Sequence, residues 1–147
     1  MLRRRGFTLV EMLAVLTLIA LVAGVAAGLI GSNLGSAKTR AAVRDLTAAL
    51  RQTRGLAIVN GEARSLEIDV DARTYQVPGK SAVQLPEELS MKLLTAATEQ
   101  TGDSKGLIRF FPDGSSSGGR ITLKRDDHEW RVEIAWLTGE VRIEEDR

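Results

Sequence analysis

The sequence contains no cysteine, a single histidine and few aromatic residues, which make up 4% of the chain. Without cysteine, the protein has no disulfide bond, no thiolate nucleophile and no cysteine ligand for a metal. The one histidine, His128, stands beside Asp126, Asp127 and Glu129 in a polar segment, where a solvated imidazole is more usual than a metal ligand. We therefore expect neither a metal nor a cofactor.

Catalytic motifs are also missing. Segment 111–119 is rich in serine and glycine, but it has neither the Gly-Lys-Ser/Thr ending of a phosphate loop nor the Gly-x-Ser-x-Gly elbow of a serine hydrolase. No helical pattern follows this segment that could offer N-terminal amides to a phosphate. A structural turn explains the segment better, and the sequence predicts that the protein is not an enzyme.

A long apolar stretch follows a basic N-terminus. Three arginines, residues 3–5, precede it, and only three polar side chains interrupt residues 7–30: Thr8, Glu11 and Thr17. As a helix these 24 residues would span roughly 36 Å, more than the roughly 30 Å of a bilayer's hydrocarbon core. We predict that residues 7–30 are the transmembrane half of an N-terminal helix. The basic flank favours a C-terminal part outside the cytoplasm.

Two alternative kinds of segment share some of these features. A secretory signal peptide also begins with basic residues, and Ala26-Ala27 could precede a cleavage point, but its apolar region is normally uncharged and only about 7 to 15 residues long. An ordinary membrane anchor fits the length. However, Glu11 lies only five residues past Gly6, and a charge inside a spanning helix costs about 2.5 to 3.5 kcal/mol. Such a carboxylate usually has a partner.

The N-terminus resembles the class III leader of type IV pilins and type II secretion pseudopilins, through its run Arg-Arg-Arg-Gly-Phe-Thr-Leu-Val-Glu. The resemblance implies that a prepilin peptidase removes leader residues 1–6 by cutting between Gly6 and Phe7, and that Phe7 is then methylated. Glu11 would become the fifth residue of the mature chain. In a filament, its carboxylate can meet the Phe7 amine of a neighbouring subunit, so that both charges are neutralised away from water and the assembly is registered.

The net charge of the chain does not favour a nucleic-acid partner. The full chain has 20 basic and 19 acidic residues, and removal of the three leader arginines leaves 17 against 19, a net charge of −2. A chain of this balance is not a polyanion binder by composition. The C-terminal residues 140–147 are acidic as well.

Helical periodicity continues after Gly31. Apolar residues recur at spacings near three, four and seven, with basic residues mostly on the other face. The recurring apolar positions are Leu34, Ala37, Ala41, Leu46, Ala49, Leu50 and Leu56. The helix should end near Val59, because Asn60-Gly61 suits a left-handed termination. We predict that residues 31–60 are the half of the N-terminal helix outside the membrane.

Residues 61–147 are predicted to form a β-rich globular domain, because the apolar period changes to two after Ala63. The expected strands lie near residues 66–70, 74–77, 107–111, 120–124, 130–136 and 141–143. Segment 90–97 fits both a helix and a strand, and we favour a strand near residues 91–95. Segment 99–105 is expected to be a polar loop and segment 115–119 a flexible connection. Trp130 and Trp136 share a parity on one expected strand, which favours packing of both in the core.

Segment 111–119 also carries a second resemblance. A strand, Phe-Pro-Asp-Gly, a serine-glycine run and another strand resemble the C-terminal signature of the minor pseudopilin H family, which includes minor pilins of the FimT kind. The resemblance implies an α+β, pilin-like fold, with a long N-terminal helix packed on a small antiparallel β-sheet domain. It also implies a structural component at the tip or initiating portion of a type II secretion pseudopilus. The implied protein is a single-pass inner-membrane protein with a periplasmic C-terminal domain, and its partners are the other minor pseudopilins and the major one.

Two rival functions are weighed against this one. A DNA-capturing minor pilin of type IV pili needs a basic, solvent-facing patch. Members of that branch resemble one another in a basic C-terminal end, from which residues 140–147 depart. A membrane-anchored enzyme would need a catalytic constellation, and none is visible. We therefore expect a pseudopilin without a nucleic-acid partner.

Overall fold

The computed structural model describes residues 8–96 and 104–146, apart from the side chains of residues 25–34. The leader residues 1–6, Phe7 and most of the expected polar loop 99–105 therefore lie outside the described residues. The chain divides into two compact units, Met1–Lys38 and Thr39–Arg147, and each is described by itself. We call the second unit the head.

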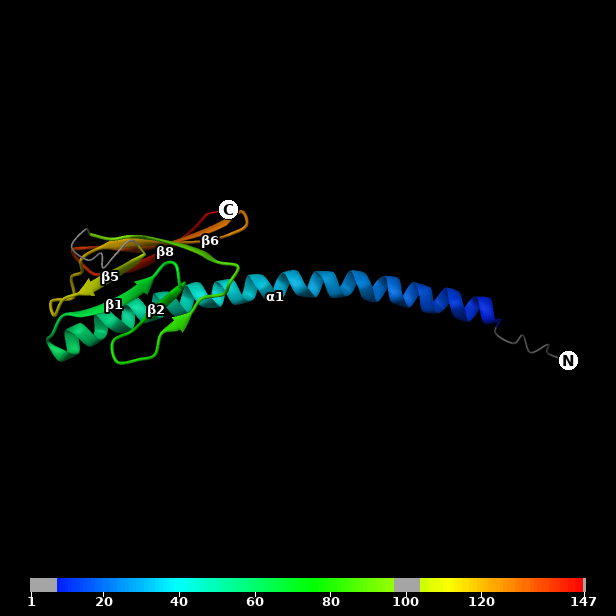
Figure 1. The fold of residues 1–147 in the computed structure, drawn as a ribbon, viewed down its shortest axis with the longest axis horizontal. Helices are drawn as coiled ribbons and strands as arrows, with labels where there is room; N and C mark the ends of the chain where they lie inside the picture. The colour runs from blue at the N-terminus through cyan, green and yellow to red at the C-terminus, as the bar shows by residue number, and fades with distance from the viewer. Residues whose placement is uncertain (1–7, 97–103, 147) are drawn as a thin grey trace. The chain divides into compact units, whose positions relative to one another are not determined.

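One long helix opens the described chain. Helix α1 (Leu9–Asn60) has 52 residues and runs from blue to green in Figure 1. Its end confirms the sequence-based prediction, because the next residue, Gly61, takes the left-handed φ of 66° that a helix terminus often needs. The predicted halves, residues 7–30 and 31–60, are thus parts of a single helical element from Leu9 onward.

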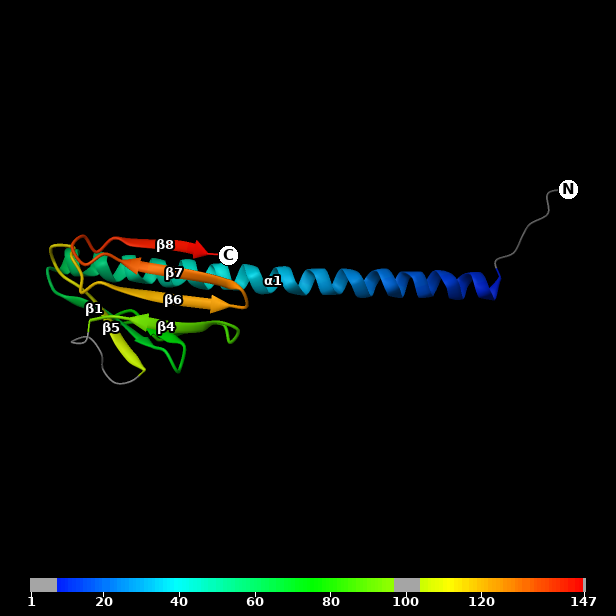
Figure 2. The same ribbon diagram turned by 90° about the horizontal axis from the view of Figure 1, so that it is seen from above.

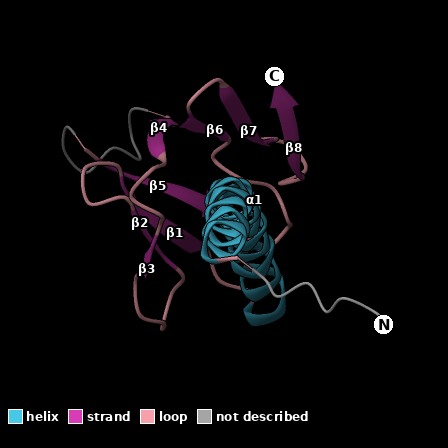
Figure 3. Ribbon diagram, turned by 90° about the vertical axis from the view of Figure 1, so that its right-hand side faces the viewer, coloured by secondary structure: helices cyan, strands magenta, loops and turns pink. Residues whose placement is uncertain are grey.

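The head contains two antiparallel sheets. The strands within the described residues are β1 (Arg64–Asp69), β2 (Thr74–Gln76), β3 (Val83–Gln84), β4 (Ser90–Leu94), β5 (Lys105–Phe110), β6 (Gly119–Arg125), β7 (His128–Ile134) and β8 (Val141–Asp146). The first sheet has the order β3-β2-β1-β5 and the second β4-β6-β7-β8. Figure 2 shows the second sheet along the helix, and Figure 3, seen along the helix axis, shows the two sheets on different sides of it.

Neighbouring strands pair as the alternation predicts. The β1–β2 hairpin turns through Arg73, which has a φ of 54°, and the Asp69 carboxylate accepts the Ala72 amide at 2.8 Å. The alternation does not predict how strands that are distant in the sequence pair with each other. Strand β1 also pairs with β5, with Leu66 opposite Ile108, and β4 pairs with β6, with Met91 opposite Leu123. These pairings build two antiparallel sheets within the small β-sheet domain that the sequence predicts.

The core of the head lies between α1 and the inner faces of the sheets. Leu46, Ala49 and Leu50 are buried as predicted, whereas Ala37 and Ala41 are exposed. The buried helix face instead includes three threonines, Thr39, Thr47 and Thr53. A buried hydroxyl needs a hydrogen-bond partner.

Two of these hydroxyls find their partner within the helix itself. Thr47 donates to the Val43 carbonyl at 2.8 Å and Thr53 to the Ala49 carbonyl at 2.9 Å. Each bond runs back four residues along α1, so neither hydroxyl needs a donor or acceptor from the sheets. The threonines can therefore take core positions that periodicity assigns to apolar residues.

Gly139 generates the first prediction. It has a φ of 62°, and a Cβ there would lie 2.2 Å from the Gly114 carbonyl oxygen. We expect Gly139→Ala to lower the free energy of unfolding by roughly 3 kcal/mol or more, through backbone strain plus displacement of the neighbouring loop. The measurement is the thermal midpoint of the purified chain.

Gly79 provides the matched control. Its φ is 77°, but a Cβ there meets nothing within 4 Å. Gly79→Ala should therefore cost only the left-handed backbone penalty of about 1 to 2 kcal/mol. Equal losses in the two variants would show that the close approach of Gly139 to Gly114 does not constrain the head.

Candidate functional site

The first turn of α1 holds an acidic side chain, Glu11. Thr8 caps the helix: the Glu11 amide donates to the Thr8 carbonyl oxygen at 3.1 Å and to Thr8 Oγ1 at 3.2 Å. Threonine at the cap with glutamate three residues later is the capping-box pairing, and a negative charge in the first turn is favourable in the helix dipole. The predicted cut between Gly6 and Phe7 lies before this cap. The Thr8 cap therefore belongs to the predicted mature chain.

The capping role of Thr8 was missed in the sequence, although the signal was available. Thr8 and Glu11 have the Thr-x-x-Glu spacing of a capping box directly before an apolar run. The spacing predicts a capping contact of the Glu11 carboxylate within its own subunit, in addition to the pairing with a neighbour that the leader resemblance implies. The two roles use different chemistry, because glutamine can replace glutamate in a capping box but cannot neutralise an amine.

The first turns of α1 expose apolar side chains on every side. All described side chains from Thr8 to Gly24 are exposed, and the large apolar ones range from 44% for Val15 to 87% for Leu9. A helix that is apolar all round is expected to be buried in other helices or in lipid. No helix built from the described residues is long and apolar enough to cross a membrane. The predicted span 7–30 includes Phe7 and the side chains of residues 25–30, which lie outside that description.

The serine-glycine segment in the head is held by hydrogen bonds. The Ser116 amide donates to the Trp136 carbonyl at 2.8 Å, and the Ser116 hydroxyl donates to the Ala135 carbonyl at 3.0 Å. The Ser117 amide donates to the Arg109 carbonyl at 2.8 Å. The segment therefore joins β5 to the end of β7. Its prediction as a flexible connection was wrong, because the serines bond to backbone groups of other strands.

Asp113 closes the turn before these serines. Its Oδ1 accepts the Ser115 hydroxyl at 2.6 Å and the Ser115 amide at 2.9 Å. The Ser115 side chain, followed by the Ser115 backbone, lowers the pKa of Asp113 below its ordinary value. A carboxylate whose pKa is lowered by folding contributes stability above its unfolded pKa, and that contribution disappears as the pH falls through the folded pKa. Asp113 thus stabilises the turn at neutral pH.

Arg54 fastens two loops of the head to α1. Its Nε donates to the Gly114 carbonyl at 2.9 Å, and its Nη2 donates to the Thr138 carbonyl at 2.8 Å. One turn earlier, Arg51 donates to the Val141 carbonyl at 3.0 Å. The two arginines place the end of the helix, the 111–119 segment and the start of β8 together. No periodicity in the sequence indicates these contacts, because each joins residues at least 60 positions apart.

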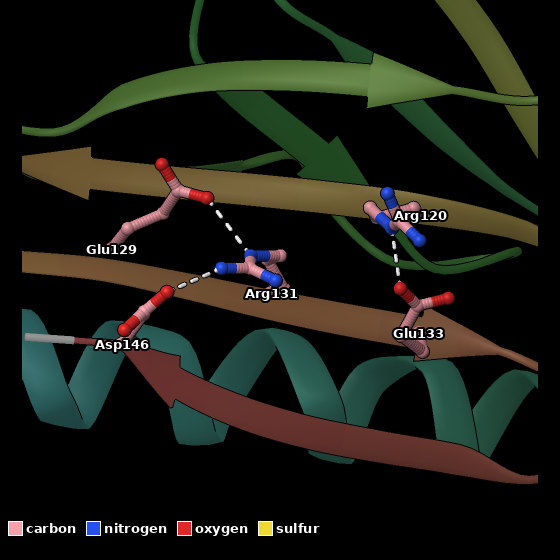
Figure 4. Close-up of polar contacts among 5 residues, drawn as sticks. All are labelled: Arg120, Glu129, Arg131, Glu133 and Asp146. Atoms are coloured by element: carbon pink, nitrogen blue, oxygen red, sulfur yellow. Dashed lines mark hydrogen bonds and ion pairs between the residues drawn. The ribbon is translucent and has the colours of Figure 1, made fainter.

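Two arginines on the outer face of the second sheet, Arg120 and Arg131, are paired with carboxylates. Arg131 lies between Glu129, at 2.9 Å, and Asp146, at 2.7 Å, and Arg120 pairs with Glu133 (Figure 4). The hydrogen bond that Arg131 donates to the Glu129 carboxylate is the main cause of a raised pKa at Arg131. These pairs lie on the surface and contribute little to stability. Their effect is to neutralise the basic charge that a phosphate backbone would need.

The two tryptophans occupy different environments. Trp130, on β7, is 6% exposed, which confirms its prediction as a core residue. Trp136 is 69% exposed, so the same prediction for Trp136 was wrong. Strand β7 ends at Ile134, and the shared parity of the two residues loses its meaning beyond that point.

His128 begins β7 opposite Arg125, and its ring stacks on Trp130 with the ring centres 5.9 Å apart. Across residues 8–96 and 104–146, no three histidine, cysteine or acidic side chains are grouped so that they could hold a metal ion.

Comparison with protein families gives two matches. The family described as "Type II transport protein GspH" matches residues 42–138, and the prokaryotic N-terminal methylation motif matches residues 1–27. The type II secretion system protein H of Xanthomonas campestris pv. campestris is 40% identical over 138 residues, which make up 94% of this chain and 82% of that protein.

Solved structures share the fold. The minor pseudopilin EpsH from the type 2 secretion system of Vibrio cholerae aligns with a TM-score of 0.57 at 17% identity, over 73% of this chain and 96% of that chain. The type IV minor pilin FimU of Pseudomonas aeruginosa aligns with a TM-score of 0.55 at 14% identity, over 75% of this chain and 90% of that chain. At these identities, the likeness concerns the fold alone.

A long N-terminal helix, antiparallel sheets and a methylation motif together define a pilin-like protein of the α+β class. Within that class, the chain belongs to the GspH family of type II transport proteins, the minor pseudopilins of the type II secretion system. The predicted family and fold class are thereby confirmed. The family is structural rather than enzymatic, and together with the methylation motif it implies pseudopilus assembly and processing by a prepilin peptidase.

Arg54 provides the prediction for the head. Arg54→Met keeps the length of the side chain but removes the donors to Gly114 and Thr138. We expect the free energy of unfolding to fall by about 1 to 3 kcal/mol, because the partly buried Gly114 carbonyl and the exposed Thr138 carbonyl lose their charged donor. Chemical denaturation of the purified chain measures the loss. Arg44→Met, at an exposed position of the same helix, should change stability by less than about 0.5 kcal/mol; a similar loss there would contradict the assignment to Arg54.

Proposed function

We propose that the chain is a subunit of the tip or initiating portion of a type II secretion pseudopilus, where it contacts other minor pseudopilins and the major one and supports export of folded proteins across the outer membrane. The observation that carries this proposal is the exposed apolar helix after Thr8, which has one carboxylate, Glu11, in its first turn. Such a surface needs other helices or lipid around it. A filament whose subunits bundle their N-terminal helices provides such surroundings.

Before assembly, the proposed location is the inner membrane. Residues 7–30 would form a single transmembrane segment, and residues 31–60 and 61–147 would lie in the periplasm. The exposed apolar side chains from Leu9 to Val22 support this placement, as do the three arginines before Gly6. The prepilin peptidase would cut between Gly6 and Phe7 and methylate Phe7. The cap at Thr8 would remain intact in the mature chain.

Glu11 would have a different role in the assembly. Its carboxylate is costly in lipid as long as the subunit is alone. In the filament it would meet the Phe7 amine of a neighbouring subunit, and each group would neutralise the other. Correct register is then the arrangement in which no charge remains unpaired. The other polar groups of the span need no such partner: Thr17, for example, donates to the Leu13 carbonyl of its own helix at 2.7 Å.

We propose no nucleic-acid partner. Three basic groups of the head have a carboxylate nearby: Arg120 pairs with Glu133, Arg125 lies 3.6 Å from Asp126, and Arg131 lies between two carboxylates. The C-terminal strand β8 is acidic. A DNA-capturing role, the nearest alternative, would need the opposite charge in a continuous patch.

Processing is tested directly on the N-terminus. Mass spectrometry of the membrane-extracted chain should find Phe7 as the first residue, carrying one methyl group. Gly6→Val should block the cut, because a branched side chain would replace the small residue that the peptidase is expected to read. A first residue near Ala27 would instead establish a secretory signal peptide.

The role of Glu11 is tested with two substitutions. Glu11→Ala removes both the charge and the capping-box partner of Thr8, whereas Glu11→Gln removes the charge alone. Both variants should insert into the membrane normally or better. Both should assemble at least about 100-fold less well, since breaking a poorly solvated ion pair costs roughly 3 to 5 kcal/mol. Crosslinking to other pseudopilins and secretion are the measurements.

Thr17→Ala is the matched control for Glu11, because the Thr17 hydroxyl is already satisfied within its own helix. This variant should assemble like the wild type. Normal assembly of Glu11→Gln together with failure of Glu11→Ala would show that Glu11 acts by capping its own helix. Normal assembly of both would remove Glu11 from the mechanism.

Binding of duplex DNA tests the alternative function. At physiological salt, the chain should bind no more tightly than the roughly 10⁻⁴ to 10⁻⁶ M typical of nonspecific contacts. The measurement is fluorescence anisotropy with labelled duplex. Submicromolar binding that is lost on changing Arg120, Lys124 or Arg125 would favour DNA capture.

A further inference from the structure

Exposed apolar side chains gather at the end of the head where α1 ends. Figures 1 and 2 show that the end of α1, the ends of β4 and β7 and the start of β6 all lie at this end. The side chains concerned are Ile58 (44% exposed), Val59 (83%), Leu94 (64%), Phe111 (36%), Trp136 (69%) and Leu137 (66%). We call these six residues the end-face patch.

Contacts across the loops hold the patch together. A Cβ at Gly114 would lie 3.4 Å from Ile58 Cδ1, and Arg54 links Gly114 to Thr138, beside Leu137. On the other side, a Cβ at Gly118 would lie 3.0 Å from Trp136 Cβ. The patch therefore combines the end of α1 and the end of β4 with Phe111, Trp136 and Leu137 of hydrogen-bonded loops.

An open groove of about 500 Å³ lies along one side of the patch, and two of the six patch residues, Leu94 and Trp136, line it. The ionised side chains in its lining are Arg120 and Glu133, which pair with each other. The groove consequently offers no uncompensated charge to a partner. A complementary surface would be uncharged and apolar, because any unpaired charge buried against it would lose its hydration without gaining a counter-charge.

The size of the patch fits one side of a protein interface. With roughly 100 Å² for a large apolar side chain and the exposed fractions above, the patch presents on the order of 400 Å² of apolar area. Apolar patches of this size on a monomer are often functional. A standard interface buries about 800 Å² on each partner, of which a little over half, roughly 450 Å², is apolar.

We infer that the end-face patch is the docking surface for the head of another pilin-like subunit, which seats an uncharged apolar side chain in the groove beside Trp136. This inference rests on the proposed function as a pseudopilus subunit. The patch lies where α1 ends, so an occupant there is the subunit that follows along the helix direction. Trp136 is the central anchor, because an exposed tryptophan beside a groove gains most from being covered.

The test uses the full chain in cells that assemble the pseudopilus. A photoreactive phenylalanine in place of Leu137 should crosslink to another pseudopilin. Replacing Trp136 by serine in the same chain should lower that crosslink roughly 30-fold, the effect typical of removing a tryptophan anchor. Val83→Ser is the matched control. Val83 is 45% exposed, close to the 44% of the patch residue Ile58, but it lies on β3, outside the patch. It should leave the crosslink unchanged.

Three further measurements make the outcome decisive. The thermal midpoint of Trp136→Ser should stay near that of the wild type, since the side chain is already exposed. Crosslinks from position 137 to lipid or to a second copy of this chain would overturn the inference, as would an unchanged crosslink in Trp136→Ser.

A second photoreactive position, Leu13 in α1, separates the two proposals. Crosslinks to pseudopilins from position 13 but not from position 137 would reject the end-face patch alone, and their absence at both positions would reject the proposed function as well.

Discussion

Burial of one face of α1 against two sheets is the interaction on which the head depends. From Thr39 onward, α1 alternates buried and exposed side chains, and its buried face supplies Val43, Leu46, Leu50 and Ala57 to the core. The first turns of the same helix have no buried side chain among those described. A single helical element thus contains two kinds of surface. One is completed by the protein's own sheets, and the other can be completed only by surroundings that the chain does not itself provide.

The end of the helix has a second consequence. Arg51 and Arg54 donate to carbonyls of two loops and of β8, and the close approach of Gly114 to Gly139 leaves no room for a side chain. In these polar contacts, the backbone carbonyls of the loops point inward, toward the two arginines. Apolar side chains such as Trp136 and Leu137 are consequently directed to the surface at the same place. The polar joining of helix and loops and the apolar end-face patch are two results of one arrangement.

Most of the local structure could be predicted from the sequence. The helix end near Asn60 and the turn between β1 and β2 follow from periodicity and turn residues, which act over a few positions. The strand at residues 90–94 is favoured by a pattern that also fits a helix. The failures have a common origin. Thr47 and Thr53 belong to the buried helix face because a hydroxyl can bond four residues back, and the buried Thr39 hydroxyl accepts a hydrogen bond from Arg125. Trp136 lies outside because β7 ends at Ile134. Counting apolar and polar positions assigns every threonine to the polar face of a helix. It also treats a strand as continuing as far as the alternation does.

The N-terminal segment shows what the linear order of residues determines. Thr8, Glu11 and the apolar run after them are neighbours in the chain, so their spacing alone specifies a capped helix with one carboxylate in its first turn. The head is different. Pairing of β1 with β5, bonding of Ser116 to the end of β7 and the reach of Arg54 to Thr138 join residues that are 19 to 84 positions apart. No local pattern encodes such contacts. They exist because burying both sheets against one helix brings these segments together, and that packing alone creates the exposed groove beside Trp136.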